Sequence, residues 1–157
     1  MAKSIIKKCT KRDIDEATRK IIGILKSGRE GSLMHEVQDS AEREINKQFK
    51  AKYDISDELE KELLLKNLCP QAISDVQIDE RIGKSRYGNK MYIYLLELDL
   101  DIERNDNIVK DKVDTYVKIE MIEPSGNKKN VLLISFHEPK KEMKKEYNNL
   151  RGWYEKE

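Results

Sequence analysis

Three side chains in the last third of the sequence are of types that can do chemistry together. Tyr116 and Lys118 stand two residues apart in the alternating run Val113–Met121, so a strand there places both on its polar face. His137 follows the apolar run Val131–Ile134, where a buried strand would reach solvent. A phenol beside an ammonium group can hold a phosphate, and an imidazole can transfer protons at neutral pH. Two plainer interpretations stay open: an ordinary polar sheet face and an exposed histidine at a strand end.

A second candidate group lies in residues 75–90, where two glycines and several basic residues indicate an exposed loop or a loose hairpin. Such a loop could contact RNA phosphates while an aromatic ring stacks on a base. A solvated loop with ordinary charges is the alternative. The candidate RNA-binding residues are Arg81, Lys84, Arg86, Tyr87 and Lys90.

Four carboxylates alternate along the strand that we predict over residues 91–103. Neighbouring members of such a row are about 7 Å apart, which is wide for a single metal ion. We interpret the row as a solvated face or as a docking surface for a basic partner. The sequence also lacks a P-loop, a dinucleotide-binding glycine motif, a zinc-protease motif and a nucleophile elbow, and we predict no metal site and no cofactor. The row consists of Glu97, Asp99, Asp101 and Glu103.

Three helices are expected to precede the strands. The first covers residues 10–27, where isoleucine and leucine recur at helical spacing. The second begins with Ser32 as its N-cap and extends to about residue 52. The third is capped by Ser56 and ends near Leu68, shortly before a proline.

The second half of the chain has the pattern of strands. Residues 91–103 end in strict alternation, residues 105–107 form a turn, and the hairpin of residues 113–137 follows. A final helix is expected from Pro139 to Gly152, because apolar residues recur there at helical spacing.

These elements predict an α+β fold with N-terminal helices, then an antiparallel sheet of at least three strands packed on them, then a C-terminal helix. One face of the sheet is expected to stay in contact with solvent, and Tyr116 and Lys118 project from it. We predict a helical extension over residues 1–55 and an α+β domain over residues 56–157, or one continuous domain.

The composition narrows the classes of function. The chain has 157 residues, of which 39% are charged and 38% hydrophobic, and its formal net charge is +1. That balance gives no overall attraction to nucleic acid or membranes, so a phosphate site must be a local patch. Cys9 and Cys69 are too few for a disulfide framework and are expected to be reduced thiols. With no apolar run of membrane-spanning length and no signal peptide, we expect a cytoplasmic protein without a membrane partner.

Two segments resemble a known family. Tyr116-Val-Lys118-Ile119, followed by Val131-Leu-Leu-Ile-Ser135-Phe136-His137-Glu138, is similar to the closing strands of the MqsR toxins. These toxins belong to the RelE-like group of bacterial ribonucleases, which cleave messenger RNA and are paired with protein antitoxins. The resemblance covers roughly residues 64–139, about half of the chain.

The resemblance implies cleavage of single-stranded RNA without a metal ion, in which the ribose 2′-hydroxyl attacks the adjacent phosphate. By position, Tyr116 would contact the scissile phosphate, His137 would be a charge stabiliser or general acid, and Lys118 matches the family's strand lysine. The loop at residues 81–90 would add phosphate contacts, and a protein antitoxin or another inhibitory protein would be the partner. The region before about residue 56 is an addition to the compact family members. The alternative function is that of a noncatalytic binding protein, such as an immunity, antitoxin-like or phage-encoded inhibitory factor.

Overall fold

A six-stranded sheet forms the centre of the protein, whose computed structural model describes residues 2–35, 37, 39–79, 90–125 and 128–152. The strand order is β1-β3-β4-β5-β6-β2. Neighbouring strands are antiparallel except for β2, which pairs with β6 in parallel. The strands are β1 (Ala2–Ser4), β2 (Leu33–Met34), β3 (Ile73–Asp79), β4 (Lys90–Arg104), β5 (Asn107–Ser125) and β6 (Lys128–His137).

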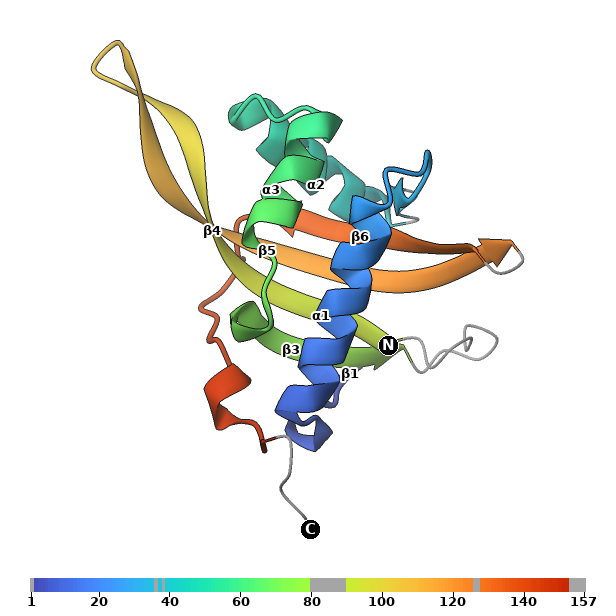
Figure 1. The fold of residues 1–157 in the computed structure, drawn as a ribbon. Coiled ribbons are helices and arrows are strands. Elements are labelled where there is room, and N and C mark those ends of the chain that lie inside the picture. The colour runs from blue at the N-terminus through green and yellow to red at the C-terminus, as the bar shows by residue number, and fades with distance from the viewer. Residues whose placement is uncertain (1, 36, 38, 80–89, 126–127, 153–157) are drawn as a thin grey trace.

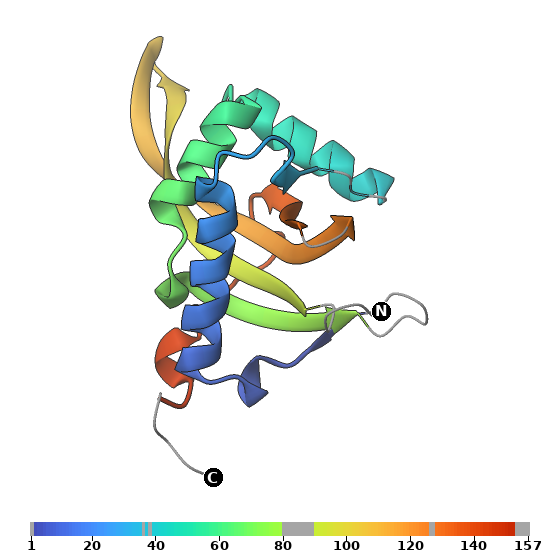
Figure 2. The ribbon, with the colours of Figure 1, turned by 45° about the vertical axis from the view of Figure 1, so that its right-hand side comes forward.

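Two helices cross one face of this sheet, and the third lies beside β6, near the β2 edge (Figures 1 and 2). Among the residues described, no helix covers the opposite face of the sheet. The helices that cross the face are α1 (Lys11–Lys26) and α3 (Asp57–Asn67), the edge helix is α2 (Ser40–Lys52), and the 3₁₀ turns are η1 (Ile6–Lys8), η2 (Pro70–Ala72) and η4 (Tyr147–Asn149).

The ends of two helices follow signals in the local sequence. The Thr10 hydroxyl accepts a hydrogen bond from Asp13 N, and the Asp13 carboxylate accepts one from Thr10 N, so the pair forms a capping box before α1. Ser56 accepts a backbone hydrogen bond at the start of α3 in the same way. The helices predicted around these residues are therefore confirmed.

The hairpin of β4 and β5 extends well beyond the neighbouring strands (Figure 1). The pairing of β3 with β4 reaches Tyr94 and that of β6 with β5 reaches Tyr116, so the outer part of the hairpin has no strand on either side. Asn105 and Asp106 form its turn with φ angles of 51° and 63°. Two positive φ angles in a two-residue loop are the type I′ geometry that matches the twist of the strands.

The predicted carboxylate row lies on this hairpin opposite lysines of β5. Lys112 Nζ is 3.2 Å from Asp99 Oδ1, and Lys110 Nζ is 3.0 Å from Asp101 Oδ1. All four side chains are exposed, so the row is part of a solvated face of ion pairs.

The core lies between the sheet and the two crossing helices. Strand β6 contributes side chains to it, and its pairing with β5 is irregular. Leu133 and Phe136 are both at most 1% exposed in the core, although an odd spacing of three residues places side chains on opposite faces of a regular strand. The pairing with β5 shifts between Lys118 and Ile119, which leaves Ile134 as an extra residue. Ile134 is therefore a β-bulge that keeps both core side chains on the same face.

The predicted fold class is wrong as stated. The sheet is mixed, the chain enters it through β1 before the first helix, and the described part of the segment predicted as a C-terminal helix contains only η4. The lysine- and glutamate-rich sequence favours a helix there, but tertiary contacts decide the conformation. Glu146 N donates to Ile73 O at 2.8 Å, and the Tyr147 hydroxyl donates to Asp15 at 2.8 Å.

The predicted start of the second helix is also wrong. The second helix begins after Asp39, whose carboxylate accepts hydrogen bonds from the first turn, and not after Ser32. Ser32 O instead accepts a hydrogen bond from Val131 N at 2.7 Å, beside the pairing of β2 with β6. Residues 73–79 form β3, which pairs with β4 in antiparallel fashion, so the described part of residues 75–90 follows the predicted hairpin and not the predicted exposed loop.

Both predicted parts of the chain contribute to one hydrophobic core. Ile14 and Ile21 come from the first part, and Leu64 and Phe136 come from the second. The division near residue 55 stays a prediction. Within the described residues, no helix has both the length and the apolar character needed to cross a membrane.

Candidate functional site

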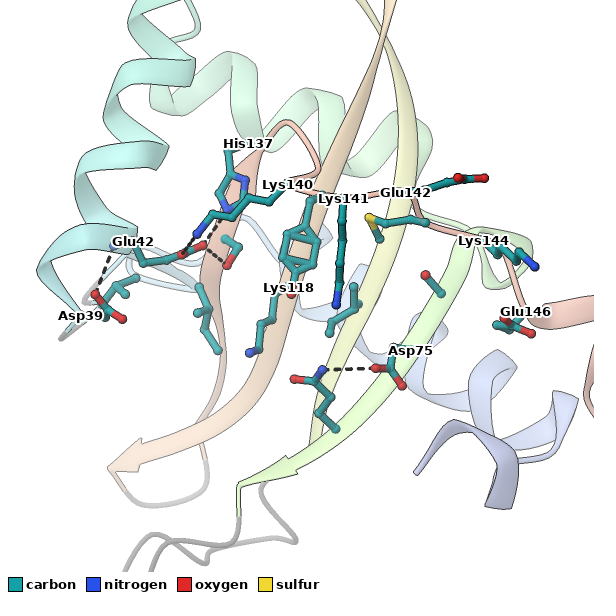
Figure 3. A pocket seen from close by; sticks show the side chains of 18 residues that line it. Asp39, Glu42, Asp75, Lys118, His137, Lys140, Lys141, Glu142, Lys144 and Glu146 are labelled. Atoms are coloured by element: carbon teal, nitrogen blue, oxygen red, sulfur yellow. Dashed lines mark hydrogen bonds and ion pairs between the residues drawn. The ribbon is translucent and has the colours of Figure 1, made fainter. Parts of the chain in front are cut away.

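A groove of about 740 Å³ lies on the helix-free face of the sheet (Figure 3). Its floor is made by β3, β4, β5 and β6. Residues 138–146, called the strap below, cross this face from the end of β6 to Ile73 on β3. The first turn of α2 closes the groove at the β6 side. The groove therefore collects side chains that are distant in the sequence.

Tyr116 and His137 are direct cross-strand partners on β5 and β6, and both line this groove. Their ring centroids are 5.2 Å apart with the planes inclined by 62°, an edge-to-face contact. Lys118, two residues after Tyr116 on β5, also lines the groove and lies opposite Ser135. The bulge at Ile134 allows this arrangement, because in a strand of regular alternation His137 would lie on the same face as Leu133, four residues earlier, and would point into the core. The structure thus brings the three predicted catalytic residues together.

The Tyr116 phenol is half-buried, and its electrostatic surroundings are negative. Burial, together with the charges of Glu42 and Asp75, raises the pKa of Tyr116 to about 12. The phenol therefore stays protonated at neutral pH. It can donate a hydrogen bond to a phosphate oxygen, and it is a poor candidate for a general base.

Glu42, in the first turn of α2, binds two groups of β6 through a single carboxylate oxygen. Its Oε2 accepts hydrogen bonds from the Ser135 hydroxyl and from His137 Nε2, the latter at 2.6 Å. Lys140 Nζ lies 3.7 Å from the other oxygen. Burial raises the pKa of Glu42, but the hydrogen bonds from Ser135 and His137 and the charges of His137 and Lys140 outweigh it and leave the pKa below its ordinary value. Glu42 is therefore ionised at neutral pH.

His137 is 2% exposed, and both of its ring nitrogens face oxygen atoms. Nδ1 is 2.8 Å from Glu138 O, which can only accept, so Nδ1 carries a hydrogen. Nε2 is 2.6 Å from the Glu42 carboxylate, and this contact needs a hydrogen as well. The ring is thus held at both nitrogens, and its charged form makes an ion pair with Glu42.

The strap is attached at both ends. Glu138 Oε1 accepts hydrogen bonds from Lys52 Nζ at 3.2 Å and from the Tyr53 hydroxyl at 3.1 Å, which ties the start of the strap to the end of α2. At the other end, Glu146 N donates to Ile73 O on β3. The strap therefore forms a fixed wall of the groove.

The charges around the groove are mixed. Lys118 and three strap lysines line it, as do five carboxylates from α2, β3 and the strap. Figure 3 shows Lys141 reaching from the strap across the groove. Because the charges nearly balance, a phosphate group would be held by particular cations and not by a broad positive field.

No protein-family model, no curated protein and no solved structure matches this chain. The resemblance to the MqsR toxins therefore stays a prediction from two strand segments.

The predicted RNA-binding loop is represented by one residue in the structure. Lys90 is exposed at the first position of β4, and it is not among the described side chains that line the groove. The other four predicted RNA-binding residues lie outside the described residues. They are Arg81, Lys84, Arg86 and Tyr87.

A second polar cluster lies between α2 and α3. Among the described residues, His35, Asp57 and Glu60 have ligand atoms within 4.8 Å of one another, as a metal site would require. The ammonium group of Lys50 already lies among them, 3.1 Å from Glu60 Oε1 and in contact with Asp57. His35 Nε2 lies 2.6 Å from the same Glu60 oxygen. We interpret this cluster as an ion-pair network that joins the two helices.

The sequence reasoning missed Glu42 and the strap lysines. Glu42 stands among many charged residues of α2, and nothing in their spacing distinguishes it from Glu44. Lys140 and Lys141 were assigned to a helix, which would have placed them away from the sheet. The pairing of distant elements, which no local pattern contains, brings these residues to the groove.

Proposed function

We propose that the groove binds single-stranded RNA and cleaves it without a metal ion. The observation that carries this proposal is the edge-to-face contact of Tyr116 and His137, 5.2 Å apart, with Lys118 lining the same groove. A phenol, an imidazolium and an ammonium group are the donors that a phosphate ester needs as negative charge develops on its oxygens.

In this proposal the ribose 2′-hydroxyl attacks the adjacent phosphorus and loses its proton to water. The bond from phosphorus to the 5′-oxygen of the next nucleotide breaks, which gives a 2′,3′-cyclic phosphate and a free 5′-hydroxyl. Tyr116 donates a hydrogen bond to a non-bridging oxygen, Lys118 stabilises the added charge, and His137 gives a proton to the leaving oxygen.

The similarity of the two strand segments to the MqsR toxins supports the same activity. It extends the proposal to a protein partner that neutralises the enzyme, and to a bacterial cytoplasm as its location. Cys9 and Cys69 are both free thiols, which is consistent with a reducing compartment.

The test is incubation of the purified full chain with a defined single-stranded RNA in the presence of a metal chelator. We expect products that end in a 2′,3′-cyclic phosphate. A 2′-deoxy substitution at the cleaved nucleotide should stop cleavage there. His137→Ala should lower the rate by about 100-fold or more, and Tyr116→Phe should lower it by about tenfold.

Two variants outside the groove serve as matched controls. His35→Gln changes the other histidine of the chain, and Tyr147→Phe removes the hydroxyl that contacts Asp15. Both should retain the activity of the natural chain. Intact RNA after incubation with well-folded protein, or an unchanged rate for His137→Ala, would refute the proposal.

A noncatalytic binding protein is the second candidate, and the burial of His137 favours it. The ring is 2% exposed and both nitrogens already have partners, as expected for a histidine with a structural role. In that case the natural chain binds RNA or a protein on this face without cleaving it. His137→Ala then lowers the stability of the fold, and there is no cleavage activity for it to change.

A further inference from the structure

Three hydrogen-bond donors of the groove wall converge on one carboxylate that comes from another part of the chain. The Ser135 hydroxyl and His137 Nε2 both donate to Glu42 Oε2, and Lys140 Nζ lies 3.7 Å from Glu42 Oε1. Glu42 is separated from Ser135 by 93 residues. The donors belong to β6 and the strap, whereas the acceptor belongs to α2.

The chemistry of these donors suits a phosphate better than it suits a structural carboxylate. A hydroxyl, an imidazolium N–H and an ammonium group together supply one neutral and two charged donors, which match the several oxygens and the charge of a phosphate. A carboxylate offers only two oxygens, and Glu42 uses one of them for both close contacts.

The α2 N-terminus is not part of this donor set. Asp39 Oδ1 accepts hydrogen bonds from Ala41 N at 2.9 Å and from Glu42 N at 3.2 Å, so these amides already have an acceptor. The donors that face the groove are therefore side chains of β6 and the strap (Figure 3).

We infer that Ser135, His137 and Lys140 form a phosphate-binding site that the Glu42 carboxylate fills in this structure. The helix α2 then acts as a built-in competitor for RNA. The inference deepens the proposed function and rests on it for the ligand, a phosphate group of the RNA strand. The inference requires the Glu42 side chain, which is 17% exposed, to rotate away from Ser135 and His137 when phosphate binds.

The arrangement also reconciles a buried His137 with a catalytic role. In the structure Nε2 points to Glu42, so the imidazolium has no hydrogen directed to a substrate. A phosphate that replaces the carboxylate would take over the same Nε2 hydrogen. His137 would then lie beside the reacting group without any change in its own position.

The test uses Glu42→Ala, with Glu44→Ala as a matched control on the same helix. Inorganic phosphate and a short single-stranded oligouridylate are titrated separately while the His137 ring signals are followed by NMR. We expect Glu42→Ala to bind both ligands about tenfold more tightly than the natural chain, because the competing carboxylate is gone. Glu44→Ala should bind as the natural chain does. Tighter binding of the oligonucleotide alone, with phosphate affinity unchanged, would count against a phosphate-binding site.

A double variant, Glu42→Ala with His137→Ala, is titrated by calorimetry beside Glu42→Ala, because it has no His137 ring signal, and it should lose the gain in phosphate affinity. Glu42→Gln, which keeps the size of the side chain, replaces Glu42→Ala if that variant fails to fold. Unchanged phosphate affinity in a folded Glu42 variant, or a gain that persists without His137, would overturn the inference. RNA cleavage is measured in parallel. Tighter phosphate binding without cleavage by any variant refutes the proposed function alone, and cleavage without tighter binding refutes this inference alone.

Discussion

Asn46 on α2 pairs with the backbone around Phe136 as a neighbouring strand would. Its Oδ1 accepts a hydrogen bond from Phe136 N at 2.9 Å, and its Nδ2 donates to Ile134 O at 2.9 Å. Short β2 covers the edge of β6 only at Val131 and Leu132. The Asn46 amide thus satisfies the part of the β6 edge nearest the groove, and it fixes α2 against the strand that carries His137.

Replacing this amide should destabilise the protein. Asn46→Ala leaves two backbone groups of a half-buried edge without partners, and we expect the free energy of unfolding to fall by about 1–3 kcal/mol. Urea denaturation measures the change. Lys47→Ala, at the next and exposed position of the same helix, should change the stability by less than about 0.5 kcal/mol. Equal effects of the two substitutions would show that the amide pairing contributes nothing.

The Glu42 carboxylate should make stability depend on pH in the acid range. Its pKa is lower in the folded protein than the ordinary value of 4.5, so its contribution is complete above about pH 4.5 and is lost as the pH falls below that value. Glu42→Gln should therefore flatten the loss of stability below pH 4.5, as measured by thermal unfolding at a series of pH values. Glu44→Gln is the control and should leave the profile of the natural chain unchanged.

Tyr116 should make stability depend on pH in the alkaline range, where stability falls as the pH rises. Its pKa rises from the ordinary value of 10.0 to about 12 on folding, so the folded state favours the neutral phenol. That contribution is complete below about pH 10 and is lost as the pH rises toward about 12. Tyr116→Phe should make the alkaline decline in stability less steep. Phenolate absorbance of the folded protein, compared with the protein in denaturant, should show one fewer late-titrating tyrosine in the variant.

The ion-pair network of α2 and α3 should respond to the loss of its cation. Lys50→Met leaves Glu60, which is 1% exposed, with only His35 as a partner, and we expect a loss of about 3 kcal/mol. The double variant Lys50→Met with Glu60→Leu should recover most of that loss, because no buried charge remains. A double-mutant cycle in urea measures the coupling, with Lys47→Met as the control. Additive effects of the two substitutions would contradict the proposed network.

Elements with strong local signals could be predicted from the sequence. Thr10 and Ser56 begin the helices expected after them, and the alternation before residue 103 identifies β4. The turn expected at residues 105–107 and the antiparallel pairing of β5 with β6 are also present. Each of these depends on residues close together in the chain.

The remaining features depend on distant contacts. The strap has the composition of a helix, but the hydrogen bond from Glu146 N to Ile73 O holds its end across the sheet. The two-residue strand β2 exists only because β6 lies beside it. For the candidate site, the shared face of Tyr116 and Lys118 followed from their spacing. The alignment of His137 with them required the bulge, and the pairing with Glu42 required the position of α2.

The bulge at Ile134 sets which face of the sheet the rest of β6 presents. With Ile134 in regular alternation, Phe136 would turn outward and the imidazole inward, whereas removing Ile134 would leave a regular strand with both side chains on their present faces. Conservative replacements of Ile134 would leave that orientation intact. A one-residue insertion beside the bulge would therefore shift the alternation by one position and exchange a hydrophobic anchor for a polar group in a single event.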